Sequence, residues 1–183
     1  MSAPAVIGEF VQRARAASAE VHRVESVEEA LARVAELRVG RGPVAAAGWG
    51  EETLAALSDR LGTEGLIRHR LRQHADAIGI GFTPASWGVA ETGTVVIDSA
   101  DINVRLASML PELHAVLLPE SRVVARMTDL CRALGAALSD APGYLAMITG
   151  PSRTADVERV LTIGVHGPRE LHILLQSGGG GAT

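Results

Sequence analysis

Residues 26–61 read SVEEALARVAELRVGRGPVAAAGWGEETLAALSDRL, and this stretch decides the class of the fold. Ser26 and Glu29 have the spacing of a capping box, and the apolar positions after them recur at the period of an α-helix. Two glycines end that helix. Val44–Ala47 is a short apolar run after a proline, as expected of a buried strand, and a second amphipathic helix begins after Gly50. The stretch therefore predicts helix, buried strand and helix in succession, which is the alternation of an α/β domain.

The rest of the chain continues this alternation and then becomes richer in strands. We expect residues 1–176 to form one three-layer α/β domain, in which helices cover both faces of a mixed sheet that is mostly parallel with an antiparallel portion. The glycine-rich residues 177–183 are expected to form a disordered tail. The strand nearest the C-terminus is expected to close the sheet. Further expected helices are 3–18 and 127–138, and further expected strands are Glu20–Val24, Ala77–Gly81, Thr94–Ile97, Ala115–Leu118, Tyr144–Ile148 and Leu171–Leu175.

The composition excludes several classes of protein. The chain of 183 residues is long enough for one domain with a sizeable core, and with 3% aromatic residues that core must be aliphatic. A net charge of -4 argues against a nucleic-acid partner, which usually requires a basic face. No apolar run approaches the roughly 20 residues that span a bilayer, and the N-terminus lacks the features of a signal peptide. We therefore expect a cytoplasmic protein that contacts neither membrane nor nucleic acid.

Three residue types limit the available chemistry. The chain has no lysine, which excludes Schiff-base catalysis and a P-loop. Its one cysteine, Cys131, excludes an internal disulfide and a cysteine-held zinc or iron–sulfur site. Cys131 falls in an apolar helical pattern, so we predict that it is a buried helix residue. His22, His69, His74 and His172 show no ligand spacing, and no metal site is predicted.

The first candidate for chemistry is the turn Glu91-Thr92-Gly93-Thr94, which leads directly into an apolar strand. Glu91 has the chemistry of a nucleophile, a base or a ligand clamp. Gly93 allows the backbone to approach a ligand closely or to take a positive φ. The alternative is that the segment is an ordinary turn with Glu91 in solvent. Trp87, just before it, either walls a pocket or packs in the core.

The second candidate is the loop Thr149–Asp156, which follows an apolar run. Ser152 or Thr154 is expected to cap a short helix that begins near residue 155, with Asp156 in its first turn. Such a loop, with Gly150 at its start, presents N–H groups to an anion at the carboxyl end of a strand. The alternative is an ordinary strand-to-helix connection, because Asp156 would compete with an anion for the same N–H groups.

Further candidate residues lie between and after these segments. His166 stands between two glycines, where it either transfers a proton or serves as a turn residue, with Gly167 beside it. Arg105 is suited to an anion, although a surface salt bridge is the alternative. Ser108 follows one helical turn later in a segment that ends at a proline. His114 opens a strand and is expected to orient the neighbouring loop.

The order of these segments resembles one known family. Ala90–Thr94 (AETGT), Ser108–His114 (SMLPELH), Thr149–Asp156 (TGPSRTAD) and Gly164–Pro168 (GVHGP) occur in the order found in the LUD-domain family of lactate-utilisation proteins, of the LutC/YkgG type. The resemblance covers roughly residues 75–176. It implies a fold similar to the NagB/RpiA/CoA-transferase group. It also implies a role in oxidising L-lactate to pyruvate beside partner proteins that carry iron–sulfur clusters, with no cofactor in this chain.

Three functions follow from these observations. The chain is an accessory subunit of a lactate-oxidising assembly that binds a small anionic metabolite, or it is a CoA-transferase-like or sugar-phosphate-type enzyme, or it senses a metabolite without chemistry. In the enzyme, Glu91 is the nucleophile or base and His166 transfers a proton. The residues expected to bind the ligand are Thr92, Gly93, Thr94, Arg105, Ser108, His114, Gly150, Ser152, Thr154, Asp156 and Gly167.

Overall fold

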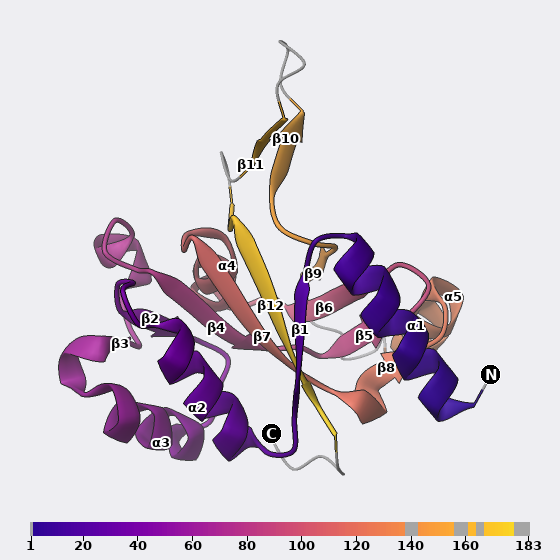
Figure 1. The fold of residues 1–183 in the computed structure, drawn as a ribbon, viewed down its shortest axis with the longest axis horizontal. Coiled ribbons are helices and arrows are strands. Elements are labelled where there is room, and N and C mark those ends of the chain that lie inside the picture. The colour runs from indigo at the N-terminus through magenta and orange to yellow at the C-terminus, as the bar shows by residue number, and fades with distance from the viewer. Residues whose placement is uncertain (1, 138–142, 156–160, 164–166, 178–183) are drawn as a thin grey trace.

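The computed structural model describes residues 2–137, 143–155, 161–163 and 167–177, and it contains two separate sheets with a hairpin. The main sheet has six parallel strands in the order β1-β12-β7-β4-β2-β3 (Figure 1). The second sheet has four strands in the order β8-β5-β6-β9, and β10 and β11 form the antiparallel hairpin. The strands are β1 (Glu20–Val24), β2 (Val44–Ala46), β3 (Leu66–Ile67), β4 (Ile80–Pro84), β5 (Trp87–Val89), β6 (Thr94–Asp98), β7 (Leu113–Pro119), β8 (Val123–Val124), β9 (Leu145–Ile148), β10 (Arg153–Ala155), β11 (Leu161–Ile163) and β12 (Glu170–Gln176).

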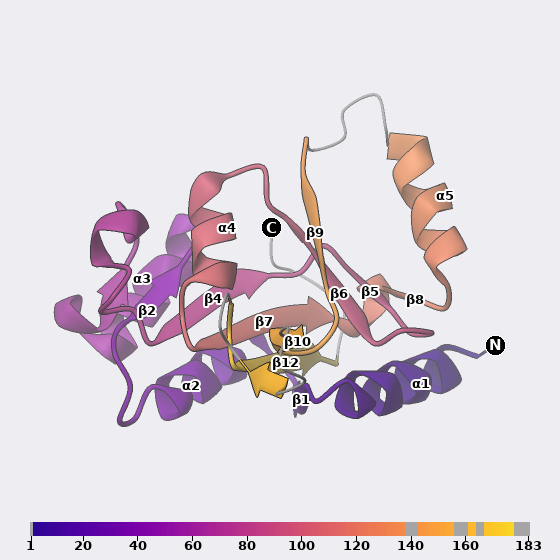
Figure 2. The ribbon, with the colours of Figure 1, turned by 90° about the horizontal axis from the view of Figure 1, so that it is seen from above.

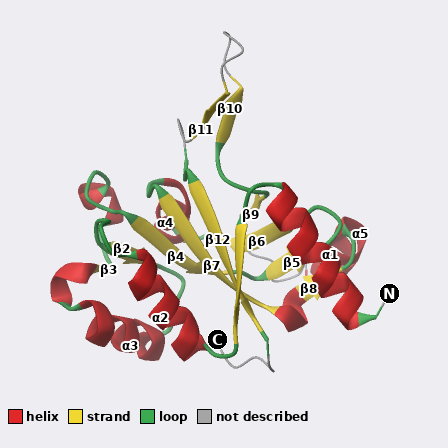
Figure 3. Ribbon diagram, in the orientation of Figure 1, coloured by secondary structure: helices red, strands yellow, loops and turns green. Residues whose placement is uncertain are grey.

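Five α-helices and three short 3-10 turns in the described part of the chain surround these sheets, as Figure 3 shows. Ser26 begins α2 as expected, since its hydroxyl accepts a hydrogen bond from the Glu29 N–H at 3.1 Å. No helix within the described ranges has both the length and the apolar character that a membrane-spanning segment needs. The helices are α1 (Ala3–Ala16), α2 (Val27–Leu37), α3 (Glu51–Leu61), α4 (Ile102–Met109) and α5 (Met127–Ala137), and the 3-10 turns are η1 (Thr63–Gly65), η2 (Leu71–His74) and η3 (Glu120–Arg122).

The main sheet is buried on both faces, which explains the continuous apolar runs of its strands. In β7, Val116 and Leu118 pack on one face into a cluster with residues of α1, α4 and the second sheet. Leu113, Ala115 and Leu117 pack on the other face against α2 and α3. Figure 2 shows α2 and α4 on opposite sides of β7. The expected α/β domain, rich in parallel strands and with helices on both faces, is therefore confirmed.

The arrangement of the strands differs from the prediction in two ways. The antiparallel pairs belong to the second sheet and to the β10–β11 hairpin rather than to a portion of the main sheet. The strand expected to close the sheet, β12, lies inside it between β1 and β7. Its side chains from Leu171 to Leu175 are buried, as an interior position requires. Spatial order depends on which strands pair across the sheet, and the apolar pattern of one strand carries no information about its neighbours.

Two local predictions also need correction. The strand expected at Ala77–Gly81 is β4, and it begins at Ile80 because the pairing with β2 starts with Val44 opposite Ile80. Cys131 is exposed rather than buried. Helix α5 packs on the second sheet through a narrow apolar cluster centred on the fully buried Leu130, and the next residue around the helix lies outside that contact.

Candidate functional site

A cavity of about 370 Å³ lies where α4, the starts of β7 and β12, and the connection from β9 to β10 meet. Six of the residues that line this cavity are ones that the sequence predicts to bind a ligand: Arg105, Ser108, His114, Gly150, Ser152 and Gly167. The remaining lining residues are Ser99, Met109, Ala146, Met147, Ile148, Thr149, Pro151, Pro168 and Leu171. Thr149, Pro151 and Pro168 belong to the glycine-rich segments that the sequence singled out. The other lining residues are mostly apolar or small and were not predicted, because nothing in their local sequence marks them.

Helix α4 presents Arg105 and Ser108 to the cavity from one face, because residues three apart are neighbours on a helix. The helix begins at Asp101, whose carboxylate accepts a hydrogen bond from the Asn103 N–H at 2.8 Å. The Ser108 hydroxyl donates to the Arg105 carbonyl at 2.9 Å. Serine in mid-helix often bonds backward in this way, and here the bond fixes the hydroxyl beside the cavity.

The guanidinium of Arg105 is positioned without a carboxylate partner among the described residues. Its Nη2 donates to the Ala100 carbonyl at 3.3 Å, and its Cζ lies 5.0 Å from the ring centroid of Tyr144. Its Nε is buried and makes no hydrogen bond within the described ranges. The surface salt bridge that the sequence left open is therefore absent from the described contacts, and a cationic donor faces the cavity.

His114 lies at the base of the cavity on β7 and is 1% exposed. Its Nε2 lies 2.8 Å from the hydroxyl oxygen of Thr83 on the neighbouring strand β4. Its Nδ1 is buried and has no partner among the described residues. Burial lowers the pKa of His114 to about 4, because an imidazolium cannot be solvated there. The side chain is thus a neutral hydrogen-bonding group at neutral pH.

The loop at Gly150 is placed by the C-terminal end of α1. Gly150 has a φ of +74°, and a Cβ there would collide with the carbonyl oxygen of Ala17. The N–H of Ser152 donates to the Pro168 carbonyl at 2.8 Å, so it is already bonded within the protein. The same hydrogen bond brings Gly167 beside Ser152. This contact joins two segments that the sequence predicted to share a site.

The prediction of a helix that begins near residue 155 is wrong. Residues 153–155 form β10, which pairs antiparallel with β11, and Figure 1 shows this hairpin projecting from the rest of the chain. The β-branched residues Thr154, Thr162 and Ile163 on the paired strands favour this outcome. Thr154 lies on β10 with its side chain outside the described atoms. Asp156 and His166 lie outside the described residues.

The segment Glu91–Thr94 lies beside the cavity but does not line it. Glu91 is exposed, and its carboxylate accepts a hydrogen bond at 2.6 Å from the N–H of Met127, the first residue of α5. It therefore stabilises the start of a helix, where unpaired N–H groups favour a negative charge. Gly93 has a φ of +67°, and the neighbour that approaches it closely is the backbone of α1 at Ala14.

Threonine hydroxyls connect this segment to the cavity. The hydroxyl oxygens of Thr92 and Thr94 lie 2.7 Å apart, and that of Thr94 lies 2.6 Å from that of Thr149. Thr149 lines the cavity. Thr92 and Thr94 thus support the cavity wall rather than form it, and Gly93 packs against α1 instead. Trp87 is half-buried and lines a different cavity of about 410 Å³, together with Trp49.

Comparison with known proteins identifies the family. A profile described as the LUD domain matches residues 7–176, nearly the whole chain. This chain belongs to the LUD domain family. The match includes the N-terminal third, which the resemblance read from the sequence did not cover.

Relatives of this LUD domain include proteins named lactate utilization protein C. The protein from Halalkalibacterium halodurans is 38% identical over 118 residues, which are 62% of this chain and 50% of that protein. The protein from Macrococcus caseolyticus is 31% identical over 153 residues, 79% of this chain and 65% of that protein. The one from Bacillus subtilis is 38% identical over 106 residues, 56% of this chain and 44% of that protein. The LUD domain described here thus matches about half the length of these curated relatives.

A solved structure shares the fold. The crystal structure of a DUF162 family protein from Deinococcus radiodurans superposes on this LUD domain with a TM-score of 0.71, covering 97% of this chain and 99% of that one. The two sequences are 19% identical. The two-sheet arrangement of this LUD domain is therefore found in an experimentally determined structure.

Proposed function

We propose that this LUD domain takes part in lactate utilisation and binds a small carboxylate-bearing metabolite in the cavity beside α4. The single observation that carries the proposal is the convergence of Arg105, Ser108 and His114 on that cavity. Relatives named for lactate utilisation supply the metabolic context. A guanidinium, a hydroxyl and a neutral imidazole together suit a carboxylate that carries a neighbouring oxygen, as in lactate and pyruvate.

Each group has a distinct part in this binding. Arg105 neutralises the carboxylate, because its guanidinium is cationic at all relevant pH values and lacks a carboxylate partner among the described residues. His114 stays neutral, so it offers a hydrogen bond without adding a second charge. Met109, Met147 and Leu171 add apolar surface to the cavity lining, and Met109 and Met147 are 55% and 51% exposed.

The oxidation itself requires an electron acceptor. Converting L-lactate to pyruvate breaks the carbinol C–H and O–H bonds and releases two electrons and two protons. One cysteine cannot hold an iron–sulfur cluster, so this chain would act beside a partner protein that carries one. Purification from the native host under anaerobic conditions should then recover an iron-containing protein with this chain, and its consistent absence would contradict the proposed partnership.

Ligand binding can be tested directly by calorimetry and thermal shift. L-lactate, pyruvate, acetyl-CoA and a sugar phosphate are compared at equal concentration. A ligand at 100 times its Kd adds roughly 2.7 kcal/mol to the free energy of unfolding. We expect L-lactate or pyruvate to raise the Tm and the other two compounds to have no effect. If neither L-lactate nor pyruvate binds, the proposal is contradicted.

A pair of arginine variants locates the binding site. Arg105→Gln removes a charge-assisted contact and should weaken carboxylate binding about tenfold to a hundredfold. Arg72→Gln changes an exposed arginine of η2 that does not line the cavity, so its affinity should equal that of the unaltered protein. Equal affinities in the two variants would place the ligand elsewhere.

The alternative enzyme, with Glu91 as nucleophile or base, makes a separate prediction. Its carboxylate would first have to leave the N–H of Met127. In that enzyme, Glu91→Gln should abolish turnover of an acyl-CoA or sugar phosphate. In the role that its contacts support, the same substitution weakens only the start of α5 and leaves carboxylate binding in the cavity intact.

A further inference from the structure

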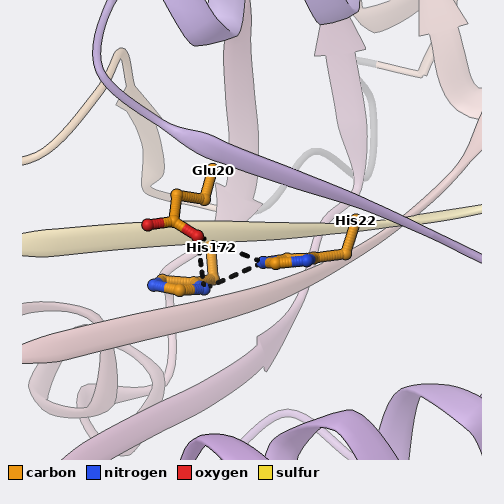
Figure 4. A group of neighbouring side chains, drawn as sticks. All are labelled: Glu20, His22 and His172. Atoms are coloured by element: carbon orange, nitrogen blue, oxygen red, sulfur yellow. Dashed lines mark hydrogen bonds and ion pairs between the residues drawn. The ribbon is translucent and has the colours of Figure 1, made fainter.

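Two neighbouring strands of the main sheet bring together three metal-ligand side chains that are far apart in sequence. Strand β1 carries Glu20 and His22, and strand β12 carries His172, which lies opposite Glu20 in the parallel register. Side chains two residues apart on a strand share a face, so all three point the same way. Figure 4 shows the Glu20 carboxylate above the facing nitrogens of the two imidazoles.

The separations between the ligand atoms suit one small ion. His22 Nε2 and His172 Nδ1 are 3.0 Å apart, and Glu20 Oε2 lies 3.7 Å from the first and 3.9 Å from the second. Bonds of about 2.0–2.1 Å in a tetrahedron place neighbouring ligand atoms about 3.3 Å apart. The observed separations lie on both sides of that value, within the reach of small side-chain rotations.

A neighbouring carboxylate prepares His172 to act as a ligand. Its Nε2 lies 3.2 Å from Glu170 Oε2, and Arg41 holds the Glu170 carboxylate with hydrogen bonds of 2.9 and 3.0 Å. When Nε2–H donates to Glu170, the lone pair of Nδ1 faces His22 and Glu20. Metal-binding histidines in proteins are commonly oriented by a carboxylate in this way.

We propose that Glu20, His22 and His172 bind a divalent first-row transition-metal ion, and that zinc is the preferred occupant. Two imidazoles and one carboxylate are a ligand set that zinc favours, whereas calcium and magnesium prefer oxygen ligands alone. The His172 side chain is 5% exposed and that of His22 is 20% exposed, but Glu20 is 66% exposed. The fourth position of the ion therefore faces solvent and is filled by water.

The site is separate from the ligand cavity, although the two share a strand. Leu171 lines the cavity on the face of the sheet covered by α4. His172, the next residue, points to the opposite face, where Leu174 packs with α2 and α3. The metal would link the edge strand β1 to β12, the strand whose start forms the cavity wall. Metal binding and carboxylate binding can therefore fail independently.

Titration of the untagged full chain with zinc chloride, after treatment with a chelator, tests the proposal. We expect one ion per chain and a rise in Tm of about 5 to 10 °C at a hundredfold excess over Kd. Cobalt(II) serves as an optical probe, because its visible absorption reports the number and type of its ligands. Glu20→Gln and His22→Ala should each weaken binding at least tenfold, and both replace side chains that are not fully buried.

Two further variants and a check of the fold complete the test. His69→Ala removes an exposed histidine outside the cluster and should leave zinc affinity unchanged. Glu170→Ala removes the group that orients His172 and should weaken binding about tenfold to a hundredfold without changing the one-to-one stoichiometry. Circular dichroism of each metal-free variant confirms its fold. Failure of the chain to bind zinc or cobalt saturably, or binding of unaltered strength in both Glu20→Gln and His22→Ala, would overturn the proposal.

Discussion

The buried neutral His114 makes the stability of this LUD domain depend on pH. Its ring is 1% exposed and burial lowers its pKa to about 4, whereas an unfolded histidine has a pKa of about 6.5. Between these two values the unfolded chain binds a proton that the folded chain excludes. The stabilisation from a neutral His114 is therefore fully present above pH 6.5 and is lost as the pH falls toward 4.

The two pKa values set the size of the effect. A difference of about 2.5 pH units corresponds to about 3 kcal/mol over the whole window, of which about 2 kcal/mol is lost between pH 7 and pH 5. Other groups titrate in the same range, so the contribution of His114 must be isolated by a variant. His114→Gln keeps a polar group near the Thr83 hydroxyl, which lies 2.8 Å from Nε2, but it cannot titrate.

Urea unfolding of both proteins at several pH values between 7 and 5 measures this contribution. We expect the unaltered protein to lose about 2 kcal/mol more than His114→Gln over that interval. His69→Gln, at an exposed position, should follow the unaltered protein throughout. A proton NMR titration should show the His114 ring signals constant from pH 8 to about 5. Parallel stability curves for the unaltered protein and His114→Gln, or a ring that titrates near pH 6.5, would refute this account of the buried histidine.

Three further predictions concern stability, and each is measured by thermal or urea unfolding. Gly150→Ala should lower the free energy of unfolding by about 2 kcal/mol or more, because Gly150 has a positive φ and an added Cβ would collide with Ala17. Gly8 lies in the middle of α1 with open space around it, so Gly8→Ala should leave the free energy of unfolding unchanged or raise it by up to about 1 kcal/mol. Equal effects of the two substitutions would contradict the close approach at Gly150. Ser26→Ala should cost about 1 kcal/mol through loss of the helix cap, and no loss would mean that the cap is not formed in solution. Leu57→Ala should cost about 2–5 kcal/mol, since Leu57 is fully buried, and a cost below 1 kcal/mol would argue against the packing of α3 on the main sheet.

Local sequence was sufficient where one segment contains all the interactions that define it. The helix from Val27 to Leu37 could be predicted because its cap and apolar stripe lie within a dozen residues. The strand Glu20–Val24 was also predicted at its observed bounds. Prediction failed for β10, where a partner strand outweighed a plausible helix cap. It failed for Cys131 because the width of the buried face of α5 depends on the sheet beneath it.

The candidate site was predictable only where the residue type alone marked a residue, because its contacts join segments that are far apart in the sequence. Arg105, Ser108 and His114 stood out by residue type, and the structure brings them to one cavity. Glu91 stood out equally, but its partner at the start of α5 is 36 residues away, and nothing near Glu91 in the sequence reveals that contact. The hydroxyl contact between Thr94 and Thr149 spans 55 residues and was equally inaccessible.

The sequence by itself determined the class of this protein, an α/β domain with an aliphatic core, because hydrophobic periodicity and helix caps act over a few residues. It also determined which groups were available for chemistry. The tertiary structure alone decided which of those groups meet. His22 and His172 showed no ligand spacing, yet they lie 3.0 Å apart because β1 pairs with β12 across 150 residues of sequence. Strand pairing of this kind depends on the packing of the whole sheet.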